Sequence, residues 1–276
     1  MGWHGHLKLD YRRTPQRTVV HDTHNGPLRV LQSLYPEGDA ICHNVLVHPP
    51  GGVVSGDVLA IEANVGSGSH ALITTPGATR FYRSLGEPAL QTLTARVAEG
   101  ARFEWLPLET ILYPDTLAEN RMRFELAPGA EMMGWDVLAL GLPASDDPFD
   151  RGRYTQSIEL PGVWLERGHV DGRDTRLLQS PLGWAGHGVL ATMWFAAGTA
   201  LAPARKETLL DAARDAIGTD PLRPTAGCSA PHGEVVVLRA LAPRVEPAMH
   251  LLAVVWRRWR REAWALDAAL PRVWRT

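Results

Sequence analysis

Short segments separated by turn residues are the feature that most constrains the fold of this chain. From Thr18 to about Trp194, runs rich in β-branched and aromatic residues alternate with Gly, Pro, Asn and Asp. This alternation is typical of strands joined by turns. The pattern predicts strands at Arg17–His21, Leu28–Leu34, Ile41–Val47, Val58–Val65, His70–Thr75, Ala89–Val97, Arg102–Leu106, Arg121–Leu126, Glu131–Leu138, Tyr154–Leu160, Val163–His169 and Val189–Phe195. So many strands with few helices between them favour a large β-rich fold over an alternating α/β sheet.

Two amphipathic helices are predicted in the last third of the chain. The first covers Pro203–Ile217, with proline at its start and glycine after its end. The second covers about Pro247–Ala265 and places apolar residues on one side, with arginines largely elsewhere. Both are expected to lie on a sheet. The loop Pro143–Gly152 is the best candidate boundary, but it is more typical of an exposed loop, so we expect one domain covering residues 1–276.

Composition excludes several classes of protein. The 276 residues carry a formal net charge of -2, which gives no general reason to expect nucleic-acid binding. Two cysteines in a chain of this length favour a reducing compartment, so we expect a cytoplasmic protein. No secretory signal is legible at the N-terminus, and the longest mostly apolar stretch, Val189–Ala204, is too short and too interrupted to span a membrane.

Two glycine motifs resemble nucleotide-binding loops but lack the rest of those sites. Gly66–Ala71 fits a dinucleotide-binding fingerprint, yet a β-branched run follows where a helix is needed, so we expect a turn between two antiparallel strands. Gly51 and Gly56 have P-loop spacing, but Asp57 stands where the phosphate-binding lysine belongs. Any GTP chemistry is therefore expected to come from a partner.

Several long motifs, in order along nearly the whole chain, resemble the UreD (UreH) family of urease accessory proteins. The strongest are His48–Asp57 (HPPGGVVSGD) and Thr74–Ser84 (TTPGATRFYRS). Further matching segments are Glu104–Pro114, Trp135–Gly141, Leu165–Arg167 and Pro271–Trp274. The chain departs from the family at Leu142, where an arginine is usual, so no role of that arginine transfers.

The resemblance implies a fold and a function. The fold would be mainly β, a large two-layer β-sheet with helix-like winding and a few flanking α-helices mostly in the C-terminal third. The chain would be a non-enzymatic metallochaperone scaffold that acts with UreF and the GTPase UreG to insert nickel into the urease apoprotein. UreE would supply the nickel. No cofactor would be bound permanently, although Ni²⁺ could bind in transit.

Three residues are candidates for handling nickel in transit. Asp57 and Glu166 match acidic positions that the family places along an internal passage, and His48 opens the strongest motif. Glu104 and Asp136 are further carboxylates beside apolar neighbours, where burial without a partner is unfavourable. The structural alternative is that such acids accept backbone N–H bonds or pair with arginines, as most buried acids do.

Two sets of residues are candidates for binding partners. Arg80, Tyr82 and Arg83 have the aromatic and arginine composition that is enriched at interfaces. Arg257 and Arg261 lie on the expected second helix, which could contact UreF or merely cover the sheet.

Two other classes of function stay open on sequence alone. One is a β-rich metal-dependent hydrolase that would use His48, Asp57 and Glu166. The other is a carbohydrate- or peptide-binding module built on the ten tryptophans.

Overall fold

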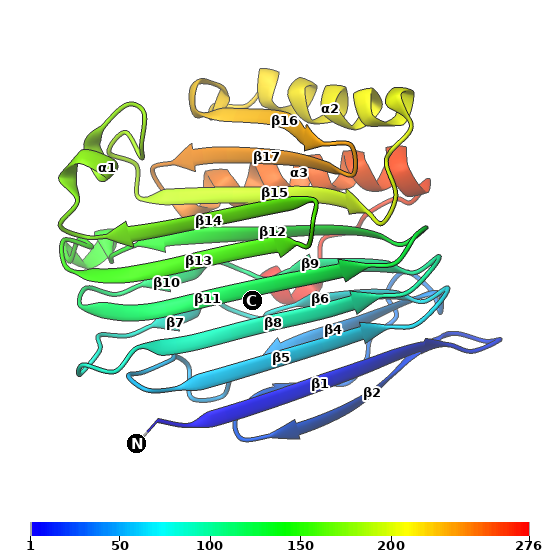
Figure 1. The fold of residues 1–276 in the computed structure, drawn as a ribbon, viewed down its shortest axis with the longest axis horizontal. Coiled ribbons are helices and arrows are strands. Elements are labelled where there is room, and N and C mark those ends of the chain that lie inside the picture. Colours follow the sequence, from blue (N-terminus) through cyan, green and yellow to red (C-terminus); the bar gives the residue numbers. More distant parts are fainter. Residues whose placement is uncertain (1, 276) are drawn as a thin grey trace.

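The computed structural model describes residues 2–275 as two stacked β-sheets with helices packed against one of them (Figure 1). The seven-stranded sheet has the order β14-β13-β11-β8-β5-β1-β2. The ten-stranded sheet has the order β16-β17-β15-β12-β9-β6-β4-β3, and β10 and β7 join it beside β12. The expected mainly β, two-layer architecture is confirmed.

The strands of the seven-stranded sheet are β1 (His4–Arg13), β2 (Thr18–Asn25), β5 (Val58–Val65), β8 (Ala89–Val97), β11 (Thr116–Leu126), β13 (Gly152–Leu160) and β14 (Trp164–Asp171). Those of the ten-stranded sheet are β3 (Arg29–Val30), β4 (Ile41–Val47), β6 (His70–Thr74), β7 (Thr79–Phe81), β9 (Arg102–Leu106), β10 (Thr110–Leu112), β12 (Glu131–Leu140), β15 (Val189–Ala197), β16 (Ala226–His232) and β17 (Val235–Ala242). The α-helices are α1 (Thr175–Gln179), α2 (Pro203–Gly218) and α3 (Val245–Trp264).

The chain winds by alternating between the two sheets. From β4 through β13 it runs from one sheet to the other and back, so consecutive coils stack as parallel strands: β5, β8, β11 and β13 in one sheet and β4, β6, β9 and β12 in the other. The expected turn at Gly66–Ala71 therefore does not join an antiparallel pair. It carries the chain from β5 to β6 in the opposite sheet, and that prediction was wrong.

The sequence pattern did not predict β1, β16 and β17 near the ends of the chain, nor the short strands β7 and β10. Residues 4–13 form β1, which pairs in parallel with β5, although no strand was predicted before Arg17. The signal was present, since Leu7, Leu9 and Tyr11 alternate with polar residues. The expected strand Leu28–Leu34 is reduced to Arg29–Val30 plus an isolated bridge from Leu34 to His43.

Alternating side chains divide the interior into two cores. One lies between the sheets and includes Leu93, Phe124 and Trp194. The other lies between the ten-stranded sheet and helices α2 and α3, and includes Trp135, Trp256 and Trp259. Both predicted C-terminal helices are thus confirmed as helices laid on a sheet.

A buried ionic chain fixes α3 to the ten-stranded sheet. The Arg260 side chain, 0% exposed, donates to Glu37 at 2.6 Å and lies 3.4 Å from the Glu104 carboxylate, also 0% exposed. Glu104 in turn bonds His70 at 2.7 Å and accepts the Trp256 indole N–H at 2.5 Å. These partners hold the pKa of Glu104 below its usual value although burial opposes them.

Removing the central guanidinium is expected to destabilise the fold strongly. The variant Arg260→Met would leave two mostly buried carboxylates without their cation, a loss of about 3–5 kcal/mol in unfolding free energy. Its exposed neighbour provides the control, because Arg261→Met should change stability by less than about 0.5 kcal/mol. Equal denaturant midpoints for the two variants would contradict this account of α3.

Candidate functional site

Asp57 organises a turn. Its carboxylate accepts the backbone N–H of Trp3 at 2.8 Å and that of Val54 at 3.0 Å, and it is buried. It thereby joins the N-terminal strand to the motif loop that precedes β5. Both hydrogen bonds of the Asp57 carboxylate are thus those of a structural acid that accepts backbone N–H groups.

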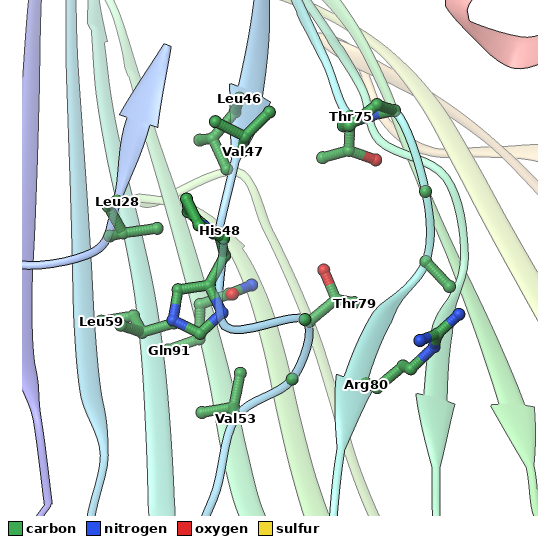
Figure 2. A pocket seen from close by; sticks show the side chains of 16 residues that line it. Leu28, Leu46, Val47, His48, Val53, Leu59, Thr75, Thr79, Arg80 and Gln91 are labelled. Carbon is green, nitrogen blue, oxygen red and sulfur yellow. The ribbon is translucent and has the colours of Figure 1, made fainter. Parts of the chain in front are cut away.

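His48 lines a pocket at the end of β4, with a volume of about 360 Å³ (Figure 2). The imidazole lies beside Leu59 and Gln91, and Thr75 and Arg80 line the opposite side. Burial lowers the pKa of His48, partly opposed by the negative charge of Asp57. The ring is therefore neutral at pH 7, and a neutral imidazole has a nitrogen lone pair free to bind a metal.

A row of amide side chains begins at this pocket and crosses the seven-stranded sheet. Gln91 on β8, Asn120 on β11 and Gln156 on β13 are register partners, and all lie on the strand face that points between the sheets. The Gln91 amide donates to Asn120 at 3.4 Å. Three neighbouring strands therefore carry amides at the same level of an otherwise apolar interior.

A second polar row faces the amides from the ten-stranded sheet. Asp136 on β12 pairs in register with Thr192 on β15, which pairs with Arg239 on β17. Asp136 and Thr192 are buried, and the Gln156 amide lies close enough to the Asp136 carboxyl for a weak hydrogen bond. We call the two facing rows, Gln91–Asn120–Gln156 and Asp136–Thr192–Arg239, the polar seam.

The hydrogen bonding of the polar seam is incomplete. Among the residues that the structure describes, the buried Gln156 amide nitrogen and Tyr154 hydroxyl have no partner within strict hydrogen-bond geometry. The amide approaches the Asp136 carboxyl, and the hydroxyl approaches the Asn120 side chain, closely enough for weak hydrogen bonding. Burial raises the pKa of Asp136 to about 6, with a smaller opposing effect from Gln156. Buried polar groups are normally paired. Here the Asp136 carboxyl has no cationic partner within residues 2–275 and lies beside an amide and a hydroxyl, whose oxygen atoms can coordinate a divalent cation.

Glu166 lies at the far end of the seam, where its carboxylate forms a two-point ion pair with Arg239 across the two sheets. An arginine partner was anticipated, but Arg239 belongs to β17, a strand that was not predicted. Four strand steps separate β14 from β5, so Glu166 lies roughly 19 Å across the sheet from Asp57. The structure thus places His48 and Glu166 at opposite ends of one seam, and Asp57 outside it.

The other candidate carboxylate has a structural role, because Glu104 lies on the helix side of the ten-stranded sheet within the ionic chain of α3. Asp136 is the one that sequence reasoning undervalued. Its signal was an acid inside the apolar run of residues 131–140. No three His, Cys, Asp or Glu side chains within residues 2–275 converge to form a complete metal-binding group.

The candidate partner-binding residues fall into two places. Arg80 and Arg83 are exposed, but Tyr82 stacks edge-on against Tyr113 at 4.7 Å and covers Gly52, where an added Cβ would lie 2.1 Å from the tyrosine ring. Tyr82 therefore shapes the motif loop. Arg257 and Arg261 are exposed on α3, and Arg261 pairs with Asp267 at 3.1 Å.

The amino-acid sequence of this chain is similar to those of accessory proteins of urease along its whole length. The family model described as UreD urease accessory protein matches residues 4–275. The urease accessory protein UreD of Leptothrix cholodnii is 62% identical over 278 residues, and that of Variovorax paradoxus is 61% identical over 276 residues; each alignment covers 100% of both chains. The chain belongs to the UreD family.

The raised pKa of Asp136 predicts a pH-dependent stability that an amide removes. The folded carboxyl titrates at about 6 against an ordinary value of 3.8, so stability should fall as pH rises from about 4 to 6 and stay reduced above that. Asp136→Asn should therefore stabilise the fold by up to about 3 kcal/mol at pH 8, and the gain should vanish near pH 4. Chemical denaturation at several pH values measures this difference.

Asp215→Asn is the control, because Asp215 is exposed on α2 and should show no such trend. A destabilised Asp136→Asn at pH 8 would mean that the carboxylate has a favourable partner in the folded protein.

Proposed function

We propose that this UreD family member is a non-enzymatic scaffold of urease maturation that passes nickel through the polar seam. It would act with UreF and the GTPase UreG on the urease apoprotein, with nickel supplied by UreE, in the cytoplasm. The observation that carries the proposal is the buried Asp136 carboxyl, which has no cationic partner in the described part of the chain and lies beside the Gln156 amide and the Tyr154 hydroxyl. Membership of a family of urease accessory proteins makes nickel the expected cargo.

The composition of the seam suits a cation in transit. Amide, hydroxyl and carboxyl oxygens are weak ligands for Ni²⁺ compared with clustered imidazoles or thiolates. Because the seam contains one carboxyl without a cationic partner among the described residues, a divalent cation would be attracted but not held in a complete coordination shell. The neutral His48 imidazole in its pocket supplies a stronger donor at one end. No permanently bound cofactor is needed.

The geometry does not favour the hydrolase alternative. Asp57 uses both carboxylate oxygens on backbone N–H groups, and Glu166 is paired with Arg239 on the far side of the sheet. His48 therefore has no second catalytic group from the proposed set within the same site.

The binding-module alternative has little support either, because the tryptophans are core residues. Eight of them are buried, and Trp3, 60% exposed, is the one with a freely accessible ring among the residues that the structure describes. A carbohydrate platform would need several such rings on one face.

The scaffold role predicts that urease maturation depends on this chain and on one carboxyl within it. Urease co-expressed with UreE, UreF and UreG should lack nickel and activity when the chain is omitted. Asp136→Asn should still co-purify with UreF but deliver much less nickel, because it removes the charge that offsets desolvation of the cation. Nickel per urease active site is the measurement. Full metallation without the chain would refute the proposed function.

We further propose that the exposed side of α3 contacts UreF. Arg257 and Arg261 point away from the sheet, while Arg258 donates to the Ala212 carbonyl of α2 and ties the helices together. Charge reversal at both exposed positions should therefore weaken UreF binding at low salt without lowering the melting temperature.

Reversal of Arg12 and Arg13, exposed at the end of β1, provides a matched control for that experiment. Equal UreF retention by the two double variants would place the UreF contact elsewhere. The next candidates would then be Arg80 on β7 and Arg83 just after it.

A further inference from the structure

The polar seam meets the surface at the edge strand β14. The register partner of Gln156 on β14 is Gly168, which continues the amide row by one strand. A Cβ added to Gly168 would have no neighbouring atom within 4 Å. The row of amide side chains therefore ends beside open space at the edge of the seven-stranded sheet.

The ion pair between Glu166 and Arg239 lies near this open space. Glu166 lies two residues before Gly168 and points to the same face of β14, between the sheets. Its partner Arg239 ends the second row of the seam. Their side chains are 27% and 41% exposed, so the pair lies at the boundary between the seam and solvent.

An arginine in this place has a strong effect on a divalent cation. Like charges within a few ångströms repel strongly where water only partly screens them. The Glu166 carboxylate, bound through two contacts, cancels most of the charge of the guanidinium. Neutralisation of Arg239 by Glu166 would therefore lower the barrier to a divalent cation at this point.

We propose that the passage opens to the surface beside Gly168 and that the Glu166–Arg239 ion pair is the gate of this opening. The inference rests on the proposed passage of nickel through the seam. It assigns Glu166 a role other than metal ligand, since its charge serves to neutralise Arg239. It also gives Gly168 a function, because any large side chain there would occupy the opening.

A plug at Gly168 tests the position of the opening. Gly168→Phe places a ring in open space on an extended strand, so the chain should fold and co-purify with UreF, while co-expressed urease loses most of its nickel. Gly168→Ala should deliver normally, because a methyl group leaves the opening clear. Ser157→Phe is the matched control, since this side chain on adjacent β13 points to the outer face of the same sheet.

Charge rescue tests the gate. Glu166→Gln leaves the guanidinium uncompensated and should reduce the nickel content of urease several-fold. Adding Arg239→Gln removes the repelling charge and should restore delivery, whereas a ligand role for Glu166 predicts no rescue. The rescue also decides the question if Gly168→Phe fails to fold.

The outcomes separate the gate from the function on which it rests. Normal delivery by a folded Gly168→Phe variant, with delivery lost in Asp136→Asn, would overturn the gate and leave the passage standing. Normal delivery by both variants would overturn the proposed nickel passage itself. Absence of rescue in the double variant would overturn the role of Arg239.

Discussion

Every second side chain of these strands must point into the space between the two sheets, and this constraint determines the rest of the structure. Most inward positions are apolar and form the core between the sheets. In a stack of parallel strands, residues at the same register lie side by side. A few polar residues such as Gln91, Asn120 and Gln156, far apart in sequence, therefore become one continuous row. The same winding sets Asp136 opposite them.

Buried carboxylates on the two faces of the ten-stranded sheet differ in whether they have a cationic partner. On the helix side, Arg260 is surrounded by Glu37 and Glu104, whose own hydrogen bonds to histidine and tryptophan are short. Such pairing stabilises one arrangement. Between the sheets, Asp136 has no cationic partner among the residues described, and its neighbours are only weakly hydrogen-bonded. A buried carboxyl without a cation is costly and requires an explanation, which the proposed passage of a divalent cation supplies.

Sequence alone predicted the class of the fold and most central strands, because turn residues and alternating hydrophobicity are local signals. It also named His48 and Glu166 as candidate residues through family motifs, and their roles stay a prediction. It could not pair Glu166 with Arg239, because that contact joins two sheets and depends on a strand that was not predicted. Nor could it show that Asp57 belongs to a turn while Asp136 faces the interior, since both are acids beside apolar residues and differ only in what the winding brings against them.

The central claim, that a divalent cation enters the space between the sheets, is tested most directly by paramagnetic NMR with methyl-labelled methionine. Met122 and Met132 belong to the core between the sheets, whereas Met133 and Met193 belong to the core on the helix side. Titration with Ni²⁺, but not with Mg²⁺, should shift or broaden the first two methyl signals before the others, and Asp136→Asn should abolish the effect. Equal perturbation of all four methyls, or of none while surface histidines respond, would contradict the account.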